Sequence, residues 1–244
     1  MSENGRTALI TAGHRGLGLE VARQMAREGF TVVIASRNPP DAERAAGSLE
    51  GAGAVTGLGV GLDITDRESV RRAREAYERE FATLDVLINN AAAYVRWEEL
   101  PSDPDFEAAH AALETNLFGA WRTVVEFLPL LRAGEHPRIV NVSSGAGSHG
   151  DPDFGLTTQG GSAPAYGISK AALNALTSKL AAELDGTPVI VNSVCPGLTA
   201  TFPGAENMGA RPVQESARSV VWAATLPDDG PRGGFFRDGK PLPW

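Results

Sequence analysis

Tyr166 and Lys170 are the side chains of this 244-residue chain whose types and spacing best suit catalysis. A spacing of four residues places both groups on one face of a helix. An ammonium beside a phenol lowers the phenol pKa, which lets the hydroxyl donate and accept a proton during a reaction. The chain has only three lysines and three tyrosines, so a pairing at this spacing is less often accidental. The pair alone does not distinguish a catalytic site from a chance pairing.

A glycine-rich turn follows the first apolar run of the chain and leads into a segment of helical spacing. Its residues are Thr11, Ala12, Gly13, His14, Arg15, Gly16, Leu17 and Gly18. Such a turn lets bare backbone approach a pyrophosphate and points helix N–H groups at it. An ordinary strand-to-helix turn is the competing interpretation, and the position directly after the first strand favours the dinucleotide site.

The end of the second apolar run indicates which dinucleotide would bind. Folds that use NAD carry an acid there for the ribose 2′-hydroxyl, whereas this chain has Ser36 followed by Arg37. An acid would repel a 2′-phosphate, while Arg37 and Arg15 can each pair with one. We therefore expect NADP(H) as the cofactor; the alternative is that either arginine is ordinary solvated surface.

The elements that must position these residues alternate between two patterns. Short β-branched runs predict strands over Thr7–Ile10, Thr31–Ala35, Val55–Val60, Val86–Ile88, Arg138–Val142 and Val189–Val194. Helical spacing predicts helices over Leu17–Glu28, Asp41–Leu49, Arg67–Phe81, Phe106–Leu131, Tyr166–Leu184 and Val213–Leu226. The alternation predicts a doubly wound parallel β-sheet with helices on both faces, a single α/β domain of the Rossmann type over residues 1–244.

Ligands of such a sheet bind outside the carboxyl ends of its strands. Segments 145–165 and 198–211 both follow predicted strands and are rich in Gly, Pro, Ser and Thr, so we expect them to be substrate loops at that edge. Side chains that could line an apolar pocket there are Trp97, Phe154, Phe202, Met208 and Trp244. Ordinary packing explains each of them equally well.

The composition excludes several classes of protein. A formal charge of −8 lacks the electrostatic footprint of a nucleic-acid or anionic-membrane binder, and no apolar run has the length of a membrane span. The single cysteine, Cys195, forbids an intrachain disulfide, and the four histidines lack metal-ligand spacing, so we expect no metal. These features, with an N-terminus that lacks an apolar signal region, favour the cytoplasm.

Several motifs together resemble the short-chain dehydrogenase/reductase family, in the order in which that family carries them. They are the glycine turn, Asn89-Asn90-Ala91, Ser143-Ser144, the Tyr166 and Lys170 pair, and the run from Pro196 through Gly197, Leu198, Thr199 and Ala200 to Thr201. The resemblance spans nearly the whole chain. It implies an oxidoreductase that acts on a small-molecule carbonyl compound or alcohol.

The resemblance also implies a role for each matching residue. Tyr166 would be the catalytic acid and base, Ser144 the hydrogen-bond donor to the substrate carbonyl, Lys170 the residue that lowers the tyrosine pKa and holds the nicotinamide ribose, and Asn116 the anchor of a proton-relay water. The cofactor would contact Asp63 and Ile64 near the adenine, Asn90 and Ala91 beside the ribose, and Pro196, Gly197, Thr199 and Thr201 near the nicotinamide. It would also contact Tyr166, Lys170, the glycine turn, Ser36 and Arg37.

Three departures from the family pattern stand out. Ala12 and Ala92 occupy positions where the family usually has Gly, and each added methyl narrows the space beside the cofactor. The 21 residues between Ser144 and Tyr166 resemble the insertion of the carbonyl-reductase branch, which is associated with a monomer; here the insertion is shorter, and monomer and homodimer both stay open.

We therefore expect an NADPH-dependent reductase of a ketone, aldehyde or quinone carbonyl. One alternative is a redox sensor or scaffold that binds NADP(H) without turnover. Another is an alcohol dehydrogenase that uses NAD, which the Ser36-Arg37 pair disfavours.

Overall fold

One eight-stranded sheet forms the centre of the computed structural model, which describes residues 5–49, 51–58 and 61–244. The strands lie in the order β3-β2-β1-β4-β5-β6-β7-β8, and β8 alone is antiparallel to its neighbour. Their bounds are β1 Thr7–Thr11, β2 Thr31–Ala35, β3 Val55–Gly57, β4 Val86–Asn89, β5 Arg138–Val142, β6 Ile190–Val194, β7 Phe235–Arg237 and β8 Lys240–Pro241. The order reverses between β1 and β4, which is where such sheets bind ligands.

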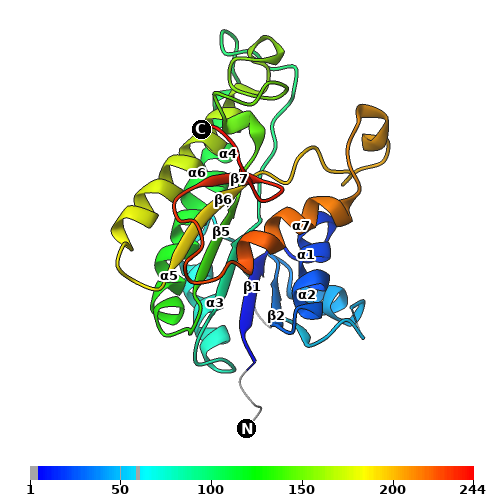
Figure 1. Ribbon diagram of the computed structural model, residues 1–244. Coiled ribbons are helices and arrows are strands. Elements are labelled where there is room, and N and C mark those ends of the chain that lie inside the picture. The colour runs from blue at the N-terminus through cyan, green and yellow to red at the C-terminus, as the bar shows by residue number, and fades with distance from the viewer. Residues whose placement is uncertain (1–4, 50, 59–60) are drawn as a thin grey trace.

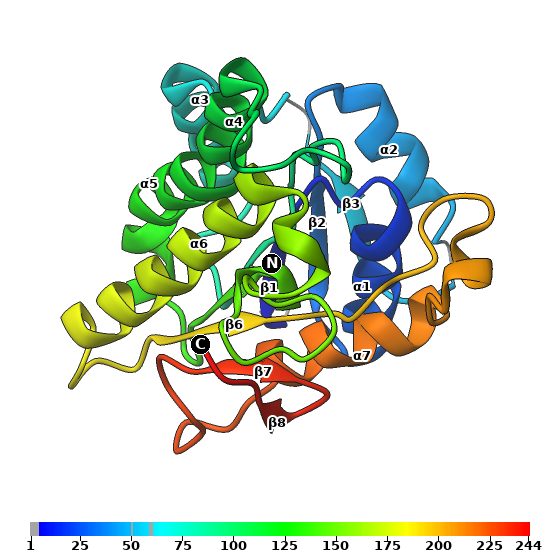
Figure 2. The ribbon, with the colours of Figure 1, turned by 90° about the horizontal axis from the view of Figure 1, so that it is seen from above.

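Helices cover both faces of this sheet (Figure 1, Figure 2). One layer holds α1 Gly16–Arg27, α2 Pro39–Gly47 and α7 Val213–Ala224; the other holds α3 Arg67–Glu78, α4 Phe106–Leu113, α5 Ala120–Arg132 and α6 Pro164–Glu183. The predicted doubly wound α/β fold is confirmed. The fold follows from the alternation of strands and helices, because a chain that forms parallel strands must return to the same end of the sheet, and a helix makes that crossover.

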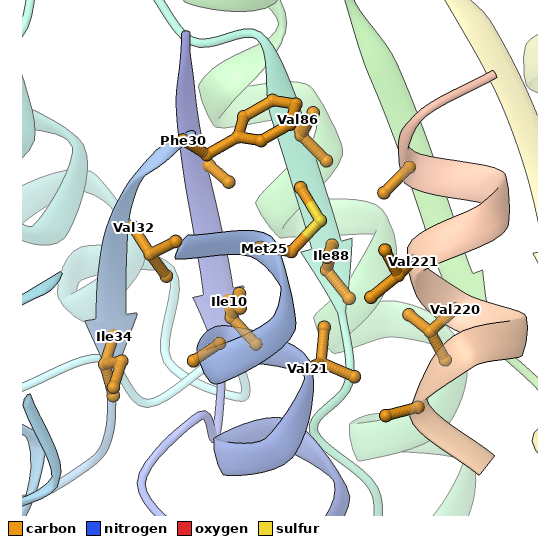
Figure 3. Close-up of a cluster of buried hydrophobic side chains, with 14 of the residues drawn as sticks. Ile10, Val21, Met25, Phe30, Val32, Ile34, Val86, Ile88, Val220 and Val221 are labelled. Carbon is orange, nitrogen blue, oxygen red and sulfur yellow. The ribbon is translucent and has the colours of Figure 1, made fainter. Parts of the chain in front are cut away.

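Apolar side chains from the strands and from the flanking helices make the core. On the face shown in Figure 3, Val21 and Met25 of α1 and Val220 of α7 pack against Ile10 and Ile88 of the sheet. A second cluster fills the opposite face beneath α3, α5 and α6. Both faces of the sheet are buried. These strands are therefore rich in β-branched residues and do not alternate regularly between apolar and polar residues.

The structure differs from the sequence prediction in three places. The predicted helix Phe106–Leu131 is interrupted by a π-helical turn over Glu114–Gly119. The third strand ends at Gly57, and the predicted end at Val60 lies outside the described residues. Strands β7 and β8 were not predicted, because runs of three and two residues show no usable periodicity.

Segments 145–165 and 198–211 both rise from the end of the sheet at which the strands finish, as Figure 1 shows. They contain the short 3₁₀ turns Gly145–Gly147, Gln159–Gly161 and Ala205–Met208, and α6 begins inside the first segment at Pro164.

Within the part of the chain that is described, none of the helices is long and apolar enough to cross a membrane. Across the same residues, no group of three or more His, Cys, Asp or Glu side chains could hold a metal ion.

Candidate active site

The glycine turn is fastened to the ends of three neighbouring strands. The Thr11 hydroxyl accepts hydrogen bonds from the backbone N–H groups of Asn90 and Ala91, at 3.0 Å each. The Asn90 side chain donates to the Thr11 carbonyl at 3.0 Å, and Gly13 N–H donates to the Ala35 carbonyl at 3.1 Å. Thr11 and Gly13 of the glycine turn therefore meet Asn90 and Ala91 of a second motif at the reversal point of the sheet.

Three positions of this turn restrict the side chain they can carry. A Cβ atom at Gly18 would lie 2.5 Å from Asn90 Nδ2 and 2.8 Å from the Ala12 carbonyl oxygen, so only glycine fits. Gly16 and Ala12 both have left-handed backbones, with φ of 53° and 50°. The family's usual glycine would adopt that conformation freely, whereas Ala12 adopts it at a cost of about 1–2 kcal/mol.

The surroundings of the turn fit a phosphate-bearing dinucleotide. His14 Nδ1 is buried and has no hydrogen-bond partner among the described residues. Arg15 and Arg37 are exposed, and neither pairs with an acid in the described part of the chain. Burial, followed by the charges of these two arginines, lowers the His14 pKa and outweighs the opposite effect of Asp41. A neutral imidazole, two free guanidinium groups and the α1 N-terminus thus face the same region, where an anion would be stabilised.

Ser36 and Asp63 flank the expected position of the adenosine. Ser36 is buried, and its hydroxyl bonds the backbone of Asn38, accepting from the N–H at 3.1 Å. Asp63 accepts from the Thr65 N–H and hydroxyl at 3.0 and 2.7 Å. Burial raises the pKa of Asp63, but the Thr65 hydrogen bonds and the charge of Arg37 outweigh it, and the net pKa is lowered. Asp63 and Arg37 therefore belong to one cluster.

Ile64 was predicted to contact the adenine, but its side chain is more buried than that of a residue at an open surface site. It is buried, and a Cβ atom at Gly119 would come within 2.7 Å of its Cδ1 atom. The side chain therefore packs against the junction of the π turn and α5.

The segment after β6 lies against the glycine turn. The Thr201 methyl carbon is 3.5 Å from the place that a Cβ atom of Gly16 would take. Arg211 Nε donates to the Pro196 carbonyl at 2.8 Å, and Thr199 donates to the Ser216 hydroxyl at 2.8 Å. The predicted nicotinamide-side residues are thus held beside the predicted phosphate site.

The residues predicted to transfer protons meet where β5 ends and α6 begins. Tyr166 lies in the first turn of α6, close to the Ser144 side chain, which follows β5. Lys170, one turn later, has its Nζ 5.7 Å from the centroid of the Tyr166 ring and donates to the Val142 carbonyl at 2.8 Å. The spacing of four residues therefore does place the two groups on one helical face.

Burial dominates the proton equilibria of this pair. It raises the pKa of Tyr166, an effect to which nearby Tyr94 adds and against which the Ser144 hydrogen bond acts. Burial also lowers the pKa of Lys170 to about 8. The direction for Tyr166 is opposite to the one that the Tyr-Lys spacing predicts, because burial disfavours the charged phenolate. The phenol therefore stays protonated at neutral pH.

Asn116 lies inside the π-helical turn, and its side chain is anchored at three points. Its Oδ1 accepts from the Ala93 N–H at 2.8 Å, while its Nδ2 donates to the Ala93 carbonyl at 3.0 Å and to the Ser169 hydroxyl at 2.9 Å. Ser169 in turn donates to the Tyr166 carbonyl at 2.7 Å. Asn116 thus connects the β4 loop to α6, and π turns of this kind are frequent at functional sites.

Comparison with known proteins agrees with this geometry. The family model described as short chain dehydrogenase matches residues 6–209. The chain belongs to this family. A short-chain dehydrogenase of Penicillium roqueforti is 35% identical over 227 residues, which cover 89% of this chain and 87% of that protein.

The carbonyl-reductase likeness is confirmed as well. Carbonyl reductase [NADPH] 3 of Mus musculus is 29% identical to this chain, and the alignment covers 100% of both proteins. Among solved structures, the active-site complex of Pseudomonas aeruginosa RhlG with NADP superimposes with a TM-score of 0.82 at 27% identity, covering 97% of this chain and 96% of the other.

Sequence patterns of the family did not reveal a buried ionic cluster behind Ser144. Arg237 of β7 pairs with Asp151, whose side chain is fully buried. Nη2 of Arg237 also lies 3.1 Å from the Sγ of Cys195, which accepts from the N–H of Gly145 at 3.1 Å. The cluster connects β7 to Gly145, the residue after Ser144. Asp151 and Arg237 are 86 positions apart, so no local spacing could have indicated the contact.

Two aromatic residues contact the Tyr166 ring, and one of them was not predicted. Tyr94 stacks on it, and Trp97 meets it edge-on. Trp97 and Phe154 also line a cavity of about 150 Å³ beside α6, whereas Phe202, Met208 and Trp244 do not line it. That Tyr94 is one of only three tyrosines could have marked it as a candidate.

The lowered pKa of Lys170 makes stability depend on pH. The folded protein releases this proton near pH 8, whereas the unfolded chain releases it near the ordinary value of 10.5. Between these values the unfolded state binds more protons, so the free energy of unfolding rises with pH. We expect wild type to gain about 2–3 kcal/mol relative to Lys170→Met between pH 7.5 and 10, measured by urea unfolding without cofactor. A constant difference between the two proteins would contradict the burial of the ammonium.

Removing the guanidinium behind Ser144 should leave a buried carboxylate without its partner. We expect Arg237→Met to lower the free energy of unfolding by about 3–5 kcal/mol in urea. Arg237→Met combined with Asp151→Asn should recover part of the loss, because the remaining group is neutral. Equal losses in the single and double variants would show that Asp151 is not the partner that matters.

Proposed function

We propose that this protein is an NADPH-dependent reductase that converts a ketone, aldehyde or quinone carbonyl to the alcohol. The observation that carries the proposal is the buried Tyr166 side chain, which stays protonated close to Ser144 and has the Lys170 Nζ 5.7 Å from its ring centroid. Two donors beside each other suit a carbonyl oxygen on which negative charge develops. A phenol with a raised pKa is in the acid form that reduction requires.

NADPH is the cofactor that the site and the relatives favour. The RhlG structure holds NADP and the Mus musculus relative is named for NADPH, in agreement with the free Arg15 and Arg37 and with Ser36 where an acid would bind NAD. When bound, the dinucleotide supplies the hydride. We place its phosphates at the glycine turn, with Asp63, Ile64 and Asn90 on the adenosine side and Pro196 to Thr201 on the nicotinamide side.

The chain's own residues then handle the proton. Tyr166 donates its hydroxyl proton to the substrate oxygen, while Ser144 holds that oxygen by a hydrogen bond. The Lys170 ammonium lies behind the ring and stabilises the phenolate that remains. Asn116 fixes the β4 loop and, through Ser169, the backbone of Tyr166. Its role as anchor of a relay water stays a prediction.

Segments 145–165 and 198–211 would enclose the substrate. Cytoplasmic location and the choice between monomer and homodimer also stay predictions.

Tyr166→Phe tests the mechanism. Loss of the hydroxyl removes the proton donor, so we expect kcat for carbonyl reduction to fall about 10²- to 10⁴-fold, followed as NADPH oxidation with a panel of ketones, aldehydes and quinones. NADPH affinity should change little. Tyr77→Phe is the matched control: Tyr77 is another buried tyrosine, whose hydroxyl bonds the Thr83 carbonyl at 3.0 Å away from the site.

Turnover that survives in Tyr166→Phe would refute the mechanism. Tight NADPH binding with no turnover of any compound in wild type would instead support a sensor or scaffold.

Ser36→Asp tests the choice of cofactor. A carboxylate there can keep the bond to the Asn38 N–H and accept from a ribose hydroxyl, and it repels a 2′-phosphate. We expect the ratio of kcat/KM for NADPH over NADH to fall about 10- to 100-fold. Ser48→Asp, which adds the same charge at the end of α2, should leave the ratio unchanged. An unchanged ratio in Ser36→Asp would show that the 2′-phosphate is not recognised here.

A further inference from the structure

The backbone around Ser144 is held on both sides. Before it, the N–H of Ser143 donates to the Val194 carbonyl at 2.7 Å, in continuation of the pairing between β5 and β6. After it, the N–H of Gly145 donates to the Sγ of Cys195 at 3.1 Å. The peptide unit between Ser144 and Gly145 is planar, so a contact at its N–H fixes its orientation. The direction in which the Ser144 side chain leaves the backbone depends on that orientation.

The guanidinium of Arg237 limits the freedom of the Cys195 side chain. Its Nε and Nη2 atoms lie 3.3 and 3.1 Å from the sulfur. A thiol sulfur is a weak acceptor at the end of a side chain that can rotate, so the Gly145 N–H alone would hold it loosely. Two further N–H groups from one rigid, planar fork hold the sulfur in a single position.

Asp151 keeps the guanidinium in this place. Its carboxylate is completely buried and pairs with Nη2 of Arg237. The N–H groups of Asp153 and Phe154 donate to the carboxylate oxygen Oδ1 at 3.0 and 2.9 Å, which prevents the carboxylate from turning. A buried carboxylate has lost its hydration and depends on its cationic partner, so the two side chains stay together.

The ion pair also packs directly against Gly145. A Cβ atom at this position would overlap with the Asp151 carboxylate and the Arg237 guanidinium, so only glycine fits. The pair therefore restrains the residue after Ser144 both through the Cys195 sulfur and by direct packing. Arg237 lies in β7, beyond residues 6–209 that the family model matches, so this support comes from outside the matched part of the chain.

We propose that Arg237 is a positioning residue for the reduction, which keeps the Ser144 hydroxyl aimed at the carbonyl oxygen of the substrate. The inference rests on the proposed reductase function. Arg237 acts through Cys195 and Gly145, and Asp151 holds it in place. A misdirected hydroxyl stabilises less of the charge that develops on the oxygen. A displacement of about 1 Å in such a group can cost about 100-fold in rate.

A double-mutant cycle with Ser144→Ala tests this role. We expect Arg237→Met to lower kcat about 10- to 100-fold, measured with NADPH and a carbonyl compound that wild type reduces. In the Ser144→Ala background, which has no hydroxyl left to aim, Arg237→Met should lower kcat less than about 3-fold.

NADPH binding gives a second readout, which does not depend on turnover. The Cys195 sulfur also accepts from the Gly197 N–H on the proposed nicotinamide side, at a longer distance of 3.4 Å. We therefore expect the Kd for NADPH in Arg237→Met, followed by NADPH fluorescence, to change less than about 3-fold while kcat falls.

Two further variants separate positioning from stability. Arg237→Met combined with Asp151→Asn leaves no unpaired carboxylate, so stability in urea should partly recover, whereas kcat should stay low because the sulfur still lacks the guanidinium. Arg138→Met is the matched control. Arg138 is another buried arginine, paired with Asp228 at the start of β5, the end of the strand away from Ser144. Its kcat should match wild type.

Urea unfolding identifies the variants that are folded under the conditions of the assay. Equal fractional losses of kcat from Arg237→Met in the wild-type and Ser144→Ala backgrounds would overturn this inference alone, because the effect would then not pass through Ser144. Recovery of kcat together with stability in the variant that also carries Asp151→Asn would overturn it too. Failure of wild type to reduce any carbonyl compound would overturn the proposed function with it.

Discussion

Burial of the Lys170 ammonium at the end of β5 is the constraint on which the rest of the site depends. A charged group in that position loses most of its hydration, and the Val142 carbonyl is the one hydrogen-bond acceptor that the described residues give it. The low pKa of about 8 follows from this burial. The same exclusion of water keeps Tyr166 protonated. Tyr166 and Lys170 are held together because α6 carries both and fixes their separation.

Charge is distributed unevenly around this centre. The chain carries a formal charge of −8. Arg15 in the glycine turn and Arg37 near it nevertheless have no acidic partners among the described residues. The cavity beside α6 is lined by uncharged residues. The positive charge therefore lies where the anionic cofactor is expected to bind, and the cavity beside α6 is uncharged.

The sequence predicted most of the fold because helical spacing and β-branched runs are local signals. The family resemblance assigned Thr11, Asn90 and Gly18 to one cofactor site, and in the structure these residues lie together. The sequence did not predict the π turn around Asn116, because Phe106–Leu131 keeps helical spacing throughout. The pKa direction of Tyr166 and the Arg237–Asp151 pair depend on tertiary burial and on contacts between distant residues, which no spacing encodes.

The most direct test of the account is to follow the hydride itself. The protein would be incubated with NADPH that carries two deuterium atoms at nicotinamide C4 and with a carbonyl compound that it consumes, and the alcohol would be analysed by mass spectrometry. A reductase of this kind gives an alcohol with one deuterium on the carbinol carbon, at a rate that collapses when Tyr166 is replaced by Phe. An unlabelled alcohol, or NADPH that is bound and never oxidised in the presence of any carbonyl compound, would contradict the account.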